Sequence, residues 1–80
     1  MDKITEKIIE ILKKIKPNVN FDENTKIVDN NLLNSFEMYK FVNELNFEFD
    51  IEILPLDIIP QNFNTLSAIK ALIEKHQDED

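Results

Sequence analysis

Ser35 is the residue whose type and position best suit a chemical modification. It stands where a loop rich in Asn and Asp meets a segment with helical spacing, within Leu32-Leu33-Asn34-Ser35-Phe36. If Asn34 or Ser35 caps that helix, the Ser35 hydroxyl is exposed beside N–H groups that lack partners within the helix. A phosphate on the hydroxyl would meet those N–H groups and the positive end of the helix dipole. From this pentapeptide alone, however, a plain capping role is the preferred interpretation.

Other catalytic arrangements are hard to build from these residues. The 80 residues include no Cys and no Gly, which excludes thiolate sites and glycine-rich phosphate loops. His76 is the only His, and Ser35 and Ser67 are the only serines. We expect His76 to be solvated near a helix C-terminus, and the scattered carboxylates to form solvated faces. The sequence therefore predicts a protein that is not an enzyme, without catalytic residues or a metal site.

Three segments have the apolar spacing of amphipathic helices. The first covers about residues 2–16 and stops before Pro17, because proline cannot continue a helix. The second covers 35–49, and the third follows a cap at Asn64 or Thr65 and runs to about His76. For the second helix, the expected buried residues are Phe36, Tyr39, Phe41, Val42, Leu45 and Phe49.

The connections complete the predicted architecture. Residues 18–34 show no clear period and read as a long ordered loop, while 50–53 alternate like a short extended stretch. Pro55 and Pro60 allow only a short helical turn between them. We therefore predict a single all-α domain over residues 1–80. It is a small antiparallel bundle of three main helices plus one short helix, with a long first loop.

Charge is distributed unevenly along the chain. The net charge is −7, yet residues 1–16 carry five Lys against three acids. An acidic surface disfavours nucleic acid as a partner and favours basic protein surfaces. No apolar run has membrane-spanning length, and the N-terminus lacks the apolar core of a signal peptide. We expect a soluble, cytoplasmic monomer that does not span a membrane.

Runs on both sides of Ser35 strengthen the case for a modification site. Upstream lie Thr25-Lys26-Ile27 and Asn31-Leu32-Leu33, and downstream lie Phe49-Asp50-Ile51-Glu52-Ile53 and Phe63-Asn64-Thr65-Leu66-Ser67-Ala68-Ile69. In order and spacing, these runs and Leu33-Asn34-Ser35-Phe36 resemble the acyl carrier and peptidyl carrier protein family over nearly the whole chain.

This resemblance implies a carrier function. A phosphopantetheinyl transferase would move a 4'-phosphopantetheine arm from coenzyme A onto Ser35, with Asn34 as the adjacent cap. The thiol of the arm would hold acyl or aminoacyl groups as thioesters, which agrees with the absence of Cys from the chain. The other implied partners are an adenylating acyl or aminoacyl ligase and downstream acyl-transferring enzymes.

The chain also departs from the family pattern. Asn34 replaces the usual Asp beside the serine, which removes a charge that a basic transferase could read. The second helix is less acidic than in fatty-acid carriers, and the proline-containing segment 54–63 resembles that of D-alanyl and other aminoacyl carriers. The expected partner contacts are Phe36, Met38, Lys40 and Phe47, although core packing is an equal alternative for Phe47.

A rival interpretation needs no prosthetic group. The same amphipathic helices and acidic surface fit a small helical protein-interaction module, in which Ser35 is only a cap. A degenerate carrier that kept the fold and lost the modification is a further form of this alternative.

Overall fold

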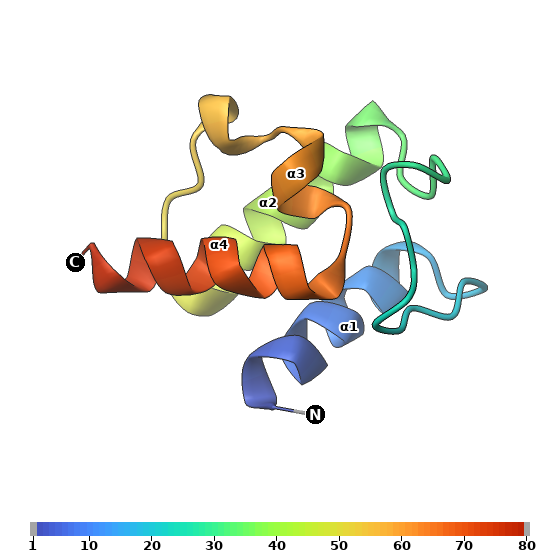
Figure 1. Ribbon diagram of the computed structural model, residues 1–80, viewed down its shortest axis with the longest axis horizontal. Coiled ribbons are helices and arrows are strands. Elements are labelled where there is room, and N and C mark those ends of the chain that lie inside the picture. Colours follow the sequence, from blue (N-terminus) through green and yellow to red (C-terminus); the bar gives the residue numbers. More distant parts are fainter. Residues whose placement is uncertain (1, 80) are drawn as a thin grey trace.

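The computed structural model describes residues 2–79, and these fold into a helical bundle (Figure 1). Three long helices form it, and the short elements lie between the second and the last. In chain order the elements are α1 (Lys3–Ile15), α2 (Ser35–Phe49), the 3-10 helix η1 (Pro55–Asp57), α3 (Pro60–Phe63) and α4 (Leu66–Asp78). The predicted all-α bundle with a long first loop is confirmed.

The predicted short helical turn between Pro55 and Pro60 is the 3-10 helix η1, and the short helix α3 (Pro60–Phe63) follows it. η1 begins at Pro55, and α3 begins at Pro60, the residue expected to end helical structure. Proline is accepted at the first position of a helix, where its missing N–H is not needed.

Local side-chain chemistry sets the ends of the long helices. The Asp2 carboxylate caps α1 by accepting from the Thr5 N–H at 2.8 Å, and Thr65 caps α4 by accepting from the Ala68 N–H at 3.1 Å. Asp50 closes α2 in the left-handed region, with φ of 53°. Glycine is the usual residue there, and because the chain contains none, Asp takes the position.

The core lies where α1, α2 and α4 meet and is closed by α3. α1 packs against both α2 and α4, and α3 packs against α4. The rings of Phe41 on α2 and Phe63 on α3 meet edge to face with centroids 6.2 Å apart. The buried apolar residues are Ile8, Ile11, Leu12, Phe21, Ile27, Phe41, Val42, Leu45, Ile53, Phe63, Leu66, Ile69, Leu72 and Ile73.

Two aromatic residues of α2 were wrongly expected in this core. Phe36 is 69% exposed and Tyr39 is 64% exposed. α2 is apolar over more than one face, and its neighbours cover only the face that bears Phe41, Val42 and Leu45. Phe36, Tyr39 and Phe47 are consequently left on the surface, whereas Phe49 is partly buried against the core.

His76 was also wrongly expected to be solvated. Its Nε2 atom lies 2.9 Å from Oδ2 of Asp57, and both side chains are about nine-tenths buried. Oδ2 also accepts from the Leu54 N–H at 3.0 Å. The pair therefore ties the end of α4 to η1, a contact between residues far apart in the sequence.

Candidate functional site

The start of α2 is held by two reciprocal hydrogen bonds. Oδ1 of Asn34 accepts from the Glu37 N–H at 2.8 Å, and Oε1 of Glu37 accepts from the Asn34 N–H at 2.9 Å. This is a capping box, which satisfies two backbone donors at once. Lys16, just after α1, reaches Glu37 with Nζ 3.1 Å from Oε2. The Asn34 N–H and then the Lys16 ammonium hold the pKa of Glu37 below its usual range.

Ser35 is the first residue of α2 and is exposed. The capping box uses the N–H groups of Asn34 and Glu37. The N–H groups of Ser35 and Phe36 precede the first donor of the intrahelical ladder, which is the Met38 N–H bonding to the Asn34 carbonyl at 2.8 Å. An anion on the Ser35 hydroxyl would therefore find two backbone donors and the positive end of the helix dipole nearby.

An open cavity of about 380 Å³ lies beside Ser35. The first turns of α2 form one side of it, and Ile58 contributes from the segment between η1 and α3. A smaller cavity of about 220 Å³ shares Met38 and Ile58 with it and reaches Phe63 of α3. The residues lining the larger cavity are Leu33, Asn34, Ser35, Met38, Tyr39 and Ile58.

The four expected partner-contact residues fall into two groups. Met38 is partly buried and lines the cavity beside Ser35. Phe36, Lys40 and Phe47 lie on another face of α2, and Nζ of Lys40 lies 5.6 Å from the centre of the Phe36 ring, a cation–π distance. Phe47 is 85% exposed, so its alternative role in core packing is wrong.

Sequence reasoning missed three features of this site. Asn34 and Glu37 have the spacing of a capping box, which predicts their reciprocal hydrogen bonds. Tyr39 follows Ser35 by one helical turn, so its place beside the serine was also readable from spacing. Ile58 lines the cavity from the segment after η1, which the Asp57–His76 contact joins to α4, and no sequence pattern indicates that contact.

Comparisons with known proteins add no assignment: no protein-family model matches the chain, and no curated protein matches it significantly. Among residues 2–79, no group of three or more His, Asp or Glu side chains is placed to hold a metal ion. None of the helices in this part of the chain combines the length and the apolar character needed to cross a bilayer.

Proposed function

We propose that this protein is a carrier that holds acyl or aminoacyl groups on a 4'-phosphopantetheine arm attached to Ser35. The observation that carries the proposal is the exposed Ser35 hydroxyl at the first position of a capped helix, beside an open cavity. The resemblance of the surrounding sequence to acyl and peptidyl carrier proteins supports it. The function is one of presentation, with no catalytic role for the chain's own residues.

The residues at the start of α2 fit a phosphodiester-linked group. The hydroxyl is exposed, and the N–H groups of Ser35 and Phe36 point toward the end of the helix where a phosphate would lie. Lys16 neutralises the nearby Glu37, which reduces the repulsion between that carboxylate and a phosphate. When bound, the arm would supply the thiol that holds cargo as a thioester.

Partner enzymes complete the proposed role. A phosphopantetheinyl transferase would attach the arm, an adenylating acyl or aminoacyl ligase would load it, and downstream acyl-transferring enzymes would receive the cargo. Because the transferase draws on coenzyme A, we propose a cytoplasmic location. We also propose that the carrier acts as a monomer. The proline-containing segment 54–63 favours an aminoacyl or specialised acyl cargo over the housekeeping fatty-acid role.

The decisive experiment is intact mass spectrometry after incubation with coenzyme A and a promiscuous phosphopantetheinyl transferase. We expect one phosphopantetheinyl group on the wild-type protein and none on Ser35→Ala. Ser67→Ala is the matched control, because Ser67 is also an exposed serine in the first turn of a capped helix. Ser67→Ala should therefore be loaded like the wild type.

Two results would contradict the proposal in different ways. A mass gain that persists in Ser35→Ala would place the modification elsewhere. Absence of any gain with several transferases would reject the active carrier, and Asn34→Asp then separates the remaining alternatives. If Asn34→Asp is loaded, the chain is a degenerate carrier that lost the charge beside its serine. If it is not loaded, the exposed Phe36 and Phe47 favour an interaction module without a prosthetic group.

A further inference from the structure

A groove between α1 and α2 lies on a different side of α2 from Ser35. Phe36, Lys40, Asn43 and Phe47 are spaced by about one helical turn each, so they form one stripe along α2. Ser35, Met38 and Tyr39 line the cavity at the start of the same helix, and none of them lines the groove. What binds in the groove is therefore a separate question from what is attached to Ser35.

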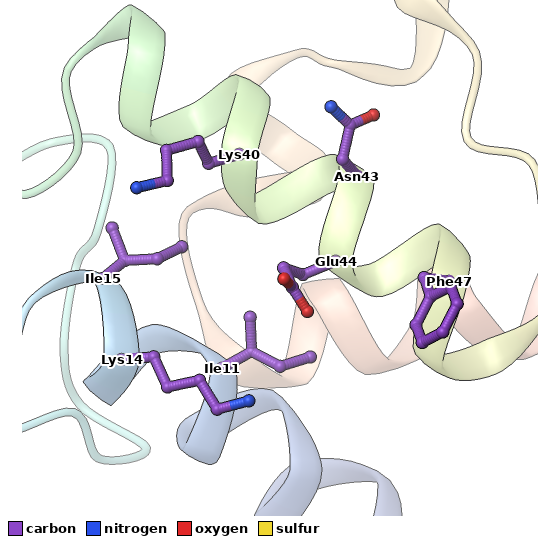
Figure 2. A pocket seen from close by; sticks show the side chains of 7 residues that line it. All are labelled: Ile11, Lys14, Ile15, Lys40, Asn43, Glu44 and Phe47. Atoms are coloured by element: carbon purple, nitrogen blue, oxygen red, sulfur yellow. The ribbon is translucent and has the colours of Figure 1, made fainter.

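The groove has an apolar floor and charged walls. It holds about 330 Å³ and is open to solvent. Figure 2 shows Ile11 and Ile15 of α1 between Lys14 on one wall and Lys40 on the other. Phe47 stands at one end with 85% of its surface exposed. We call this surface the α1–α2 groove.

The two lysines on its walls lack carboxylate partners. Elsewhere Lys7 of α1 pairs with Glu48 of α2 at 3.6 Å, and Lys16, just after α1, pairs with Glu37 of α2 at 3.1 Å. Within residues 2–79, neither Lys14 nor Lys40 forms an ion pair. Both lysines are exposed, and Nζ of Lys40 lies 5.6 Å from the centre of the Phe36 ring, so a carboxylate of a partner protein can reach either ammonium group.

Glu44 is the one acidic residue lining the groove. Glu44 follows Lys40 by four residues on α2. A helical pair with Lys before Glu is less stabilising than a pair with Glu before Lys. The groove therefore carries two lysines against one glutamate, a net positive charge on a protein whose total is −7. A patch of sign opposite to the whole molecule selects a partner by local charge complementarity.

We propose that the α1–α2 groove binds an acidic amphipathic helix of a partner protein. Apolar side chains of that helix pack on Ile11, Ile15 and Phe47, and its carboxylates pair with Lys14 and Lys40. Exposed aromatic side chains are enriched at protein interfaces, and complementary charges add specificity to the contact. The whole-molecule charge predicts basic partners, whereas this groove selects an acidic segment.

The test uses a synthetic helix-forming peptide of about 15 residues, long enough to keep a helix when bound. Leucines line one of its faces and glutamates flank them, and a second peptide has Lys in place of every Glu. Fluorescence anisotropy measures binding of each labelled peptide to the full chain, and amide chemical shifts locate the contact. We expect the Glu peptide to bind, with shifts along 11–15 and 40–47, and the Lys peptide not to bind.

Two variants test whether the peptide binds in the groove, and two others are controls. The double variant Lys14→Glu/Lys40→Glu should weaken binding by about 10-fold or more, and Phe47→Ala by several-fold. The matched control is Lys3→Glu/Lys26→Glu, which makes the same change in net charge at exposed lysines outside the groove. The peptide affinity of this control should stay within about 2-fold of the wild type at an ionic strength that screens long-range charge effects. Ser35→Ala should bind like the wild type, which separates this result from the test of the carrier function.

Several results would overturn the proposal. These are no binding of the Glu peptide, equal binding of both peptides, or chemical shifts that map to another surface. If the control double variant loses as much peptide affinity as Lys14→Glu/Lys40→Glu, binding depends on net charge alone. If the Glu peptide does not bind and sedimentation instead reveals a dimer that Phe47→Ala abolishes, the groove is an interface between two copies of this chain.

Discussion

Asn34 and Glu37 determine how the Ser35 hydroxyl is presented. Their reciprocal hydrogen bonds of 2.8 and 2.9 Å hold the backbone on both sides of the serine, so its position does not depend on a flexible loop. Asn supplies the same capping oxygen as Asp without its charge. Asn34 therefore gives the start of α2 the geometry of an Asp cap without a negative charge beside Ser35.

Asp57 is the buried charged residue of the described chain, with 6% of its surface exposed. It accepts hydrogen bonds from Leu54 N–H and from His76, and its own carbonyl accepts from Nδ2 of Asn62 at 2.8 Å. A buried carboxylate is tolerated only when such donors replace water. One residue thus joins η1, α3 and α4.

Replacing Asp57 should change how stability depends on pH. The hydrogen bond from the Leu54 N–H lowers the pKa of Asp57, and burial acts in the opposite direction. His76 lowers the pKa further, so it lies below its ordinary 3.8. A group whose pKa is lower in the folded state contributes stability that is complete above the unfolded value and is lost as pH falls through the folded value. Asp57→Asn should therefore be less stable than the wild type near neutral pH and lose less stability on acidification below about pH 4.

Urea unfolding between about pH 3 and 7 measures this difference. Asp78→Asn, an exposed carboxylate near the end of α4, is the control and should follow the wild-type profile. If Asp57→Asn loses stability on acidification as steeply as the wild type, the Asp57 contacts do not account for the loss of stability at low pH.

The segment 17–34 is the element whose order is least expected from its own residues. It has no long helix or strand, yet it is hydrogen-bonded to Asn64, which lies 36 residues beyond Val28 in the sequence. Oδ1 of Asn64 accepts from the N–H groups of Val28 and Asp29 at 2.9 and 3.0 Å, and the Asn64 carbonyl accepts from Ile27 N–H at 2.7 Å. These bonds fix the path by which the chain enters α2.

Asn64→Ala should loosen this segment while leaving the long helices formed. Two backbone N–H groups that are not fully buried lose their acceptor, which should cost about 0.5–1.5 kcal/mol of unfolding free energy. Hydrogen exchange should accelerate at the amides of Val28 and Asp29 before it does in the core of α2. Asn30→Ala, at an exposed residue of the same segment, is the control. Uniform acceleration across all helices in Asn64→Ala would contradict a local role for Asn64.

At the scale of the whole molecule, a single small core supports every element. An 80-residue chain buries a limited fraction of its surface, so each large core residue matters. Phe41 is fully buried on α2 and meets Phe63 of α3, which links the longest helix to the shortest α-helix. Phe47 lies on the same helix and is almost fully exposed.

This contrast predicts opposite outcomes for two identical truncations. Phe41→Ala should lower the unfolding free energy by about 3–5 kcal/mol, because it removes a buried ring and leaves a cavity. Phe47→Ala should change it by less than about 0.5 kcal/mol. Thermal and urea unfolding followed by circular dichroism provide both values. A comparable loss in the two variants would mean that Phe47 is covered in solution, by a second copy or by a rearranged α2.

The sequence by itself determined the helices and their ends. Apolar spacing, Pro17, and the capping residues Asn34 and Thr65 act within one or two turns of chain, so local chemistry is sufficient. The position of Ser35 at the start of a helix belongs to this group. Pro60 is the exception. Helical structure was predicted only up to this residue, but Pro60 is the first residue of α3, a position that proline accepts.

Only the tertiary structure decided which apolar and polar side chains are covered. Phe36 and Phe41 have the same type and lie on the same helix, yet one is exposed and the other buried, since α2 is apolar on more faces than its neighbours can cover. The His76 side chain is about nine-tenths covered and contacts Asp57, which comes from another part of the chain. Helical periodicity shows which residues share a face, but coverage depends on distant elements. The α1–α2 groove and the cavity beside Ser35 arise for the same reason.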